Sequence, residues 1–268
     1  MMAGTTTARP PRLSAHLRHT LVSAAVVAVV IWSATGLDYS GLATFDPALA
    51  GDVFTGLLSP DWSFVYDGSG EDLVSLLALT AGIAWFGTAI AAVLAVPMAL
   101  VSSRNLWGNG IVPRVGKFVC NVLRAFPELV YAIIFVKVVG PGPFAGVLAI
   151  GVHQVGMLGK LFTEQIEAMD EAPAEAVRAV GGSFWQAFFC ARMPQLMPIF
   201  SSLTLNHFEI AVRSASTLGL VGAGGIGAPL IFAIQARTWP TVSIILLGVI
   251  VTVFVLDAVT GWIRARLR

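Results

Sequence analysis

Charge is what this chain has least of. Only 12% of its 268 residues are Asp, Glu, Lys or Arg, whereas 56% are hydrophobic. An average soluble domain has about 25% charged residues, and so few charges cannot cover the surface of a water-soluble globule of this size. The net charge of +1 also lacks the basic excess of a nucleic-acid-binding protein. Composition therefore excludes a cytosolic enzyme, a disordered chain and a nucleic-acid partner. It predicts an integral membrane protein surrounded by lipid.

Cysteine is nearly absent as well, because the chain has only Cys120 and Cys190, far apart in sequence. Neither has a second Cys or a His at metal-ligand spacing. We therefore expect no metal site and no disulfide framework, and we interpret both as small buried hydrophobes. The chain also lacks the G-x-x-x-x-G-K-[S/T] loop that binds nucleotide phosphates. No cofactor is expected in this chain.

Long apolar runs are what the sequence has in excess. A spanning helix needs about 20 mostly apolar residues, and six segments approach this: residues 20–37, 73–101, 115–139, 144–162, 196–215 and 242–263. A seventh apolar segment, 218–234, is short and rich in glycine, so we expect it to be re-entrant or interfacial. The sequence thus predicts an all-α, multi-pass membrane protein with about six transmembrane helices.

The distribution of Lys and Arg predicts the orientation. Basic residues without nearby acids precede the first run and end the chain: Arg9, Arg12, Arg18, Arg264, Arg266 and Arg268. The segment 38–72 carries seven acidic residues and no Lys or Arg. We therefore expect both termini in the cytoplasm. Residues 1–72 would form a cytoplasmic segment, the first span and an acidic outward loop, and 73–268 a transmembrane core.

Charged residues inside the apolar runs are candidates for function. Arg124 and Glu128 lie four residues apart in the third run, as do Glu209 and Arg213 in the fifth. Such charges are costly in a membrane and usually face a partner or water. We expect ion pairs between helices first, and a transport pathway as the alternative. Pro127 is expected to kink the third span. Four neutral polar residues are predicted to form hydrogen bonds between helices: His153, Gln154, Asn206 and His207.

The segment 169–194 has the pattern of two short helices joined by glycines. Asp170 is suited to cap the first helix, and Pro173 fits its first turn. The pair Gly181 and Gly182 offers a left-handed stop, Ser183 caps a second helix, and Pro194 is expected to end it. Small alanines make the first helix slim, which suits insertion into a groove of a partner. The alternative is a solvated hairpin without a partner.

The same segment resembles the EAA loop of ABC-importer permeases. Glu175 and Ala176 begin the pattern, Gly181 follows six residues after the Glu, and Pro194 nineteen after it. The sequence departs from the pattern at Val177 and at the residue before the proline. The resemblance implies that the first short helix is a coupling helix that docks on a separate cytoplasmic ATPase. ATP and Mg²⁺ would then be bound by that partner.

Two further stretches, 123–136 and 213–227, resemble the permeases of phosphonate-type importers. That group carries phosphonates and, in some members, phosphite or phosphate. The resemblance implies the transmembrane domain of an ABC type I importer, similar to the methionine permease, in the inner membrane. It further implies a homodimer that works with an ATPase dimer and an extracytoplasmic substrate-binding protein.

A glycine-rich element lies within the second of these stretches. Gly222, Gly224 and Gly227 fit G-x-G-x-x-G, and Gly225 lies between them. A dinucleotide site needs this motif between a strand and a helix, with an acid about 20 residues later. Here the context is apolar and Leu247 stands in the place of the acid, so we reject such a site. These glycines are expected to permit close helix packing and irregular backbone.

Together these patterns predict a permease subunit rather than an enzyme, for phosphonate or a related phosphorus oxyanion. Two alternatives stay open: a proton-coupled secondary carrier that uses the Arg/Glu pairs, and an ABC permease for another small solute such as an amino acid. Internal repeats, common in secondary carriers, are not evident in the sequence. A membrane-embedded enzyme is a third hypothesis, which would need Asp, His or Ser residues clustered at one depth.

Overall fold

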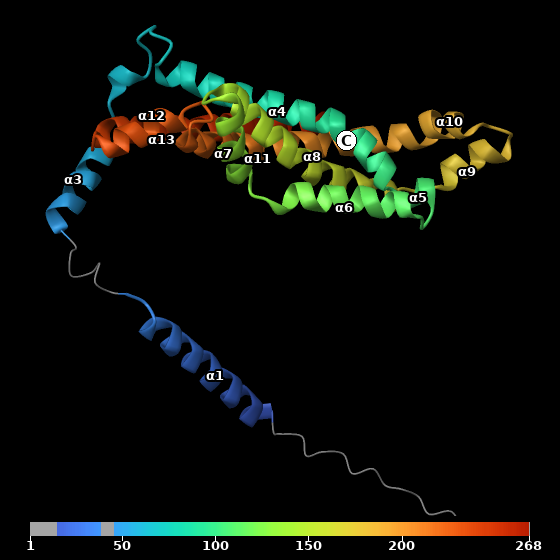
Figure 1. Ribbon diagram of the computed structural model, residues 1–268, viewed down its shortest axis with the longest axis horizontal. Coiled ribbons are helices and arrows are strands. Elements are labelled where there is room, and N and C mark those ends of the chain that lie inside the picture. Colours follow the sequence, from blue (N-terminus) through green and yellow to red (C-terminus); the bar gives the residue numbers. More distant parts are fainter. Residues whose placement is uncertain (1–14, 39–45, 268) are drawn as a thin grey trace, which may run out of the picture. The chain divides into compact units, whose positions relative to one another are not determined.

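A computed structural model describes residues 15–38 and 46–267, and within these ranges it contains helices and no strand (Figure 1). The predicted all-α class is confirmed. The chain divides into two units, Met1–Gly51 and Asp52–Arg268. The first unit holds α1 (Ala15–Thr35), whose described side chains are almost all exposed and mostly apolar, as suits a helix in lipid. Arg9, Arg12 and Arg268, used above for the orientation, lie outside the described residues.

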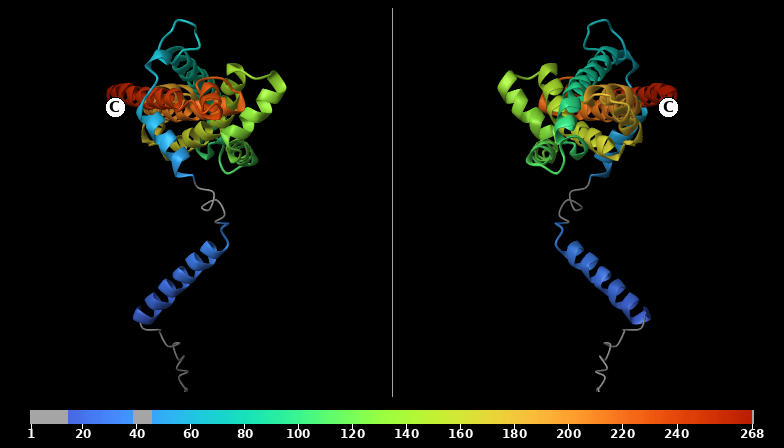
Figure 2. Two further views of the ribbon diagram at one scale, coloured as in Figure 1. Left: turned by 90° about the vertical axis from the view of Figure 1, so that its left-hand side faces the viewer. Right: turned by 90° about the vertical axis from the view of Figure 1, so that its right-hand side faces the viewer.

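The second unit is a helical bundle (Figure 2). Its elements begin with α3, which starts in the first unit, and follow in chain order: α3 (Pro47–Leu58), η1 (Trp62–Phe64), α4 (Leu73–Ser102), α5 (Arg104–Trp107), α6 (Ile111–Ala125), α7 (Glu128–Val139), α8 (Pro143–Ala168), α9 (Ala172–Ala179), α10 (Phe184–Ala187), the π-helical η2 (Phe188–Arg192), α11 (Met193–Leu218), η3 (Gly219–Val221), α12 (Gly227–Gln235) and α13 (Trp239–Leu267). The α9 and α10 helices lie at one end of the bundle, and α12 lies at the other (Figure 1).

Three of the six predicted spans coincide with helices that are long and apolar enough to cross a membrane. Among the described residues these are α4, α8 and α13. The fifth predicted span lies within α11, which is also 26 residues long but carries a polar stretch around His207 and Glu209. The first lies in α1, whose apolar part is shorter.

The third predicted span is wrong as a single helix, because the chain breaks at Phe126 and Pro127. Phe126 has the extended conformation (φ −92°, ψ 133°) and ends α6, and Pro127 precedes the start of α7. The helical region is disfavoured for a residue before proline, because its backbone clashes with the ring. Pro127 also has no N–H to donate to the preceding turn. The proline therefore separates two helices, where a kink was expected.

The acidic segment 38–72 contains α3 and η1, where the sequence predicts a loop. Its carboxylates cap helix starts: Asp46 Oδ1 accepts a hydrogen bond from the Ala48 N–H at 2.9 Å. Asp72 caps α4 by accepting from the Ser75 N–H at 2.8 Å and the Gly68 N–H at 3.3 Å. These hydrogen bonds, that from Ser75 first, lower the pKa of the Asp72 carboxyl below its ordinary value. Part of the acidic charge is thus explained by capping.

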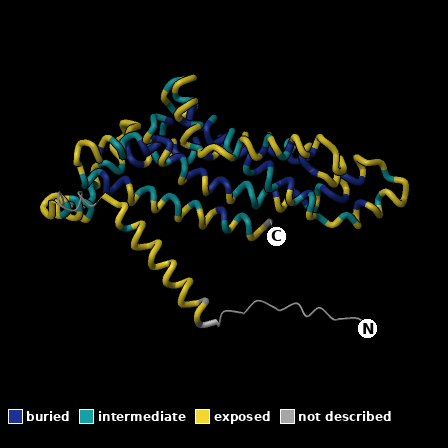
Figure 3. The backbone as a smooth tube through the Cα atoms, turned by 60° about the horizontal axis from the view of Figure 1, so that its bottom comes forward, coloured by how far each residue is buried: buried dark blue, intermediate teal, exposed yellow. Residues whose placement is uncertain are grey.

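Close packing of α4 on α8 forms the core of the bundle, where the buried residues gather (Figure 3). Small residues recur every fourth position on the facing side of α4: Gly87, Ala91, Ala95 and Ala99, all buried. A Cβ on Gly87 would lie 2.8 Å from Ile150 Cγ2 of α8. Helices in membranes associate through such small residues, because they let backbones approach and pack.

We predict that Gly87→Val destabilises the bundle by about 1–3 kcal/mol, because the added side chain overlaps Ile150 in a packed interface. Thermal unfolding of the purified chain in detergent measures the effect. Gly82→Val on the same helix is the matched control, since nothing lies within 4 Å of its Cβ position. Equal unfolding temperatures for the two variants would contradict the assignment of this interface.

Candidate functional site: the α9–α10 hairpin

The segment 170–193, here the α9–α10 hairpin, is held together by an ion pair between a buried arginine and a half-buried glutamate. Arg192 of η2 is 1% exposed, and its Nη2 donates to Glu171 Oε2 at 2.8 Å, with Nε at 3.2 Å from the same oxygen. Phe184 stacks against the guanidinium, with Cζ 5.7 Å from the ring centre. Because Glu171 is the residue before α9, this pair fixes the start of α9 to η2. Charges this buried are stable only when paired.

The turn of the hairpin is formed by the predicted glycines. Gly181 has φ +87°, a left-handed conformation that favours glycine, and its N–H donates to Arg178 O at 2.9 Å. The Gly182 N–H donates to Val177 O at 2.9 Å, and a Cβ on Gly182 would lie 2.6 Å from that oxygen. The expected left-handed stop after the first short helix is therefore present in the structure.

The second half of the hairpin starts where the sequence predicts and ends elsewhere. Ser183 caps α10: its Oγ accepts from the Gln186 N–H at 3.3 Å, and Gln186 Oε1 accepts from the Ser183 N–H at 2.7 Å. The expectation that Pro194 ends this helix is wrong. Pro194 lies in the first turn of α11, directly after the π-helical η2. The chain continues from α10 through the π-helical η2 into α11.

The two faces of α9 differ in exposure. Ala174 is fully buried against Ala187 and Ala191 in a small apolar cluster. The predicted site residues Glu175 and Ala176 lie on the exposed side. Beyond the end of α9, Val180 is 87% exposed, although it is a large hydrophobic residue. The hairpin therefore presents a slim, partly apolar surface whose inner side is already fixed to the bundle.

We predict that Arg192→Met frees α9, because Glu171 loses the charged partner that holds it. The loss of a charged hydrogen bond is worth roughly 1.5–3 kcal/mol, so amide hydrogen exchange in α9 is expected to quicken by about tenfold or more. Arg178→Met is the control on an exposed position of the same helix. Unchanged exchange in the Arg192 variant would show that the ion pair does not hold the hairpin.

The charged residues that lie four apart in the sequence do not pair with each other. Arg124 lies at the end of α6, and its Nε donates to Asn121 Oδ1 at 3.1 Å. Glu128 begins α7 and lies 3.8 Å from His153 Nε2 of α8. Because the chain breaks between α6 and α7, Arg124 and Glu128 do not share one helix face, and each has a different partner.

Glu209 forms an ion pair between helices, as expected for the charged residues of the apolar runs. Glu209 is 8% exposed and pairs with Arg264 of α13, Nη2 to Oε1 2.6 Å, and it also accepts from the Thr260 hydroxyl. Arg213 is exposed and forms no ion pair among the described residues. Glu209 therefore links α11 to α13 through an ion pair between helices.

We expect Glu209→Gln to lower the unfolding temperature of the chain, because Arg264 loses its anionic partner, at a cost of roughly 1.5–3 kcal/mol. Arg213→Gln is expected to leave that temperature unchanged. Thermal unfolding of both variants in detergent distinguishes this pairing from the local one. A larger loss for the Arg213 variant would favour the pair four residues apart.

The glycine-rich element packs at the end of the bundle away from the hairpin (Figure 1). Gly222, Gly224 and Gly225 have φ between +80° and +84°. The Ile226 N–H donates to Thr80 Oγ1 of α4 at 2.9 Å, and Gly222 O accepts from the Gly142 N–H at 2.9 Å. Gly227, at the start of α12, lies directly against Ser216 O. Irregular backbone here is satisfied by protein, as membrane depth requires.

The remaining polar residues act within the bundle. Gln154 Nε2 donates to His207 O at 3.1 Å, which joins α8 to α11 as predicted, whereas Asn206 is exposed. Cys120 is buried as expected, but the same expectation for Cys190 is wrong because it is exposed. Among the described residues, no group of three or more His, Cys, Asp or Glu side chains could hold a metal ion.

Sequence reasoning missed the contacts between residues far apart in the chain. Glu171 and Arg192 are 21 residues apart, and Glu209 and Arg264 are 55 apart. No local pattern links the members of either pair. The only local signals were an acid at position 171, two residues before Pro173, and an Arg between two apolar runs.

Residues 91–268 match the family model described as "Binding-protein-dependent transport system inner membrane component". This is more than half of the chain, and the chain belongs to that family. Its relatives include the phosphite transport system permease protein PtxC of Stutzerimonas stutzeri, 37% identical over 91% of this chain and 86% of the relative. Another is the phosphate-import permease protein PhnE of Mycolicibacterium smegmatis, 35% identical over 80% of this chain. The chain spans only 40% of the length of that second relative.

A solved structure supports the predicted fold. The MetNI methionine ABC transporter, in an inward-facing conformation, matches with a TM-score of 0.59 and 17% identity, over 84% of this chain and all of that one. At this identity the likeness concerns the fold. The expected transmembrane domain of an ABC type I importer, similar to the methionine permease, is thus confirmed. The protein is a membrane permease subunit.

Proposed function

We propose that this chain is the permease subunit of an ATP-driven importer for phosphonate, phosphate or phosphite, and that the α9–α10 hairpin couples it to a separate ATPase. The main observation in support of this proposal is the structure of the hairpin. The exposed side of α9 is free to meet a partner, while the buried side is joined to α11 through Glu171 and Arg192. A displacement of α9 by the partner would therefore be transmitted to α11, because no flexible loop separates the two.

The cargo is inferred from the relatives. The names of two relatives include the words phosphate and phosphite. The match to the phosphite permease covers most of both chains. A phosphorus oxyanion is therefore the substrate class we assign. Another small solute, such as an amino acid, is less well supported, because the methionine transporter matches at only 17% identity.

The partners follow from the family and from the hairpin. A binding-protein-dependent permease works with a substrate-binding protein outside the membrane, and ATP with Mg²⁺ would be bound by the ATPase. Each chain offers one hairpin and an ATPase dimer has two clefts, so we propose a homodimer with two-fold symmetry. The hairpin and both termini then face the cytoplasm, in agreement with the Lys/Arg distribution. Hydrolysis would belong to the partner, and this chain would not be an enzyme.

The secondary-carrier alternative loses its main support. It needed Arg124 with Glu128, and Glu209 with Arg213, as proton-relaying pairs. Neither pair forms, since Glu128 lies near His153 and Glu209 is bound to Arg264 and Thr260.

We predict that Ala176→Arg abolishes co-purification of the ATPase and uptake of phosphate or methylphosphonate at normal protein levels. The new side chain projects from the exposed side of α9, so folding is not disturbed but docking is. Affinity purification from membranes and uptake of labelled substrate measure the two effects.

The control is Ala236→Arg, an exposed position directly after α12 at the other end of the bundle. It is expected to retain the ATPase. Normal ATPase recovery with the Ala176 variant would contradict the docking role of α9.

A further inference from the structure

A polar cavity of about 250 Å³ lies in the seam between α6 and α8. A single buried water needs only about 10–15 Å³, so the cavity has room for a tetrahedral anion and several waters. Its charged and amide side chains come from one face of each helix: Lys117, Asn121 and Arg124 of α6, and Lys160, Glu164 and Glu167 of α8. Neither the hairpin nor any ion pair described above accounts for this cavity.

Close packing fixes the two helices beside the cavity. A Cβ on Gly156 of α8 would lie 2.8 Å from Arg124 N, and one on Gly159 would lie 3.1 Å from Cys120 Sγ. The backbones therefore touch along one edge of the seam, while the charged side chains occupy the other. Glu167 also accepts from the Arg104 N–H at 2.8 Å, which places one end of the cavity beside α5. From there α6 leads about 10 Å inward, at 1.5 Å per residue, from Lys117 to Arg124.

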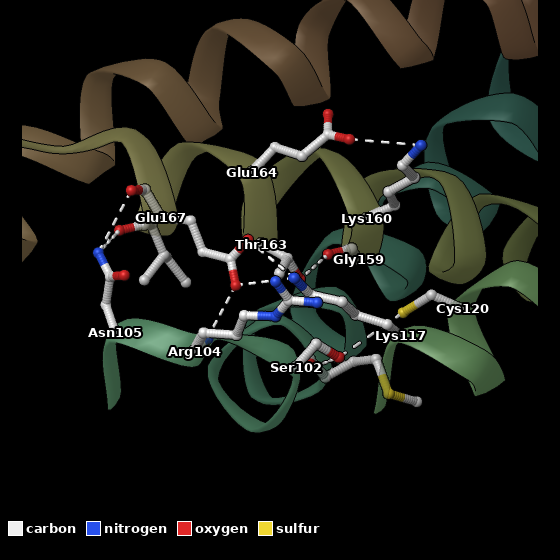
Figure 4. A network of polar contacts seen from close by, with 12 residues as sticks. Ser102, Arg104, Asn105, Lys117, Cys120, Gly159, Lys160, Thr163, Glu164 and Glu167 are labelled. Carbon is white, nitrogen blue, oxygen red and sulfur yellow. Dashed lines mark hydrogen bonds and ion pairs between the residues drawn. The ribbon is translucent and has the colours of Figure 1, made fainter. Parts of the chain in front are cut away.

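The cavity has three cationic residues and two carboxylates, and the carboxylates are already engaged. Lys117 Nζ lies 2.8 Å from both oxygens of Glu167, and Lys160 Nζ lies 3.3 Å from Glu164 Oε1 (Figure 4). Arg124 is left with the Asn121 amide alone and has no carboxylate partner in the described part of the chain. A half-buried guanidinium inside a membrane protein requires water or an anion.

We propose that this cavity binds a tetrahedral oxyanion, with the Arg124 guanidinium as its main contact and with Lys160 and Asn121 beside it. The fork of guanidinium N–H groups matches the geometry of phosphate oxygens, and a lysine adds a compact charge. This inference rests on the proposed function: the ion is the imported phosphorus oxyanion, held at the hairpin end of the bundle before release. Arg124, which the sequence predicts as a candidate pathway residue, is thus assigned an oxyanion as its ligand.

The test is equilibrium binding of ³²P-labelled inorganic phosphate to the full-length chain in phosphatidylcholine nanodiscs, without binding protein or ATPase. The wild type is expected to bind saturably, with displacement by methylphosphonate. Arg124→Gln is expected to weaken binding at least tenfold, and Arg124→Lys less. Arg114→Gln, an exposed arginine of the same helix outside the cavity, is the matched control and is expected to bind normally. Unfolding temperatures identify any variant that fails to fold.

Equal binding by wild type and Arg124→Gln, or no saturable binding by the wild type, would overturn the proposal. So would displacement of phosphate by anionic phospholipid but not by methylphosphonate, because the cavity would then hold a lipid headgroup. Uptake of the same two compounds by cells tests the importer separately. Binding without uptake would refute the proposed function and keep the site, whereas uptake with Arg124-independent binding would refute the site alone.

Discussion

The structure depends above all on the close approach of α4 and α8. Small residues at every fourth position of α4 let the two backbones meet, and a Cβ at Gly87 would overlap Ile150. A second face of α8 receives α6 through Gly156 and Gly159, and Gln154 joins α8 to α11. Because α8 is fixed on all these sides, its end gives the hairpin a firm base. The same helix also forms one wall of the charged cavity.

Two buried or partly buried ion pairs extend this frame to α11. Arg192, at the base of α11, holds the start of α9 through Glu171, and Glu209 near its other end holds α13 through Arg264. The hairpin and α13 are thus joined to one continuous helix. Coupling by rigid motion needs such an arrangement, since a displaced surface helix moves a membrane helix only if few flexible segments lie between them. The π-helical η2 lies at this junction, and π-helical turns are frequent at functional sites.

Much of the fold and of the α9–α10 hairpin was predictable from local sequence. Composition predicted the membrane class, and Gly181, Gly182 and Ser183 predicted the hairpin and its second helix, since turns and caps depend on neighbouring residues. The break at Pro127 was underestimated as a kink. The partners of Arg192 and Glu209 were missed because tertiary packing, and not spacing along one helix, brings them together. The contacts of Arg124 depend on the break between α6 and α7, and those of Glu209 on the packing of α13 against α11, and neither can be derived from spacing along one helix.

The central claim is that the exposed side of α9 meets the ATPase, and site-specific photo-crosslinking from residue 176 in native membranes tests it most directly. A photoreactive amino acid at Ala176 is expected to form an adduct with a P-loop ATPase, identified by mass spectrometry. The same group at the exposed Ala236 should give no such adduct. Crosslinks from residue 176 to lipid alone, or equal ATPase adducts from both positions, would contradict the account.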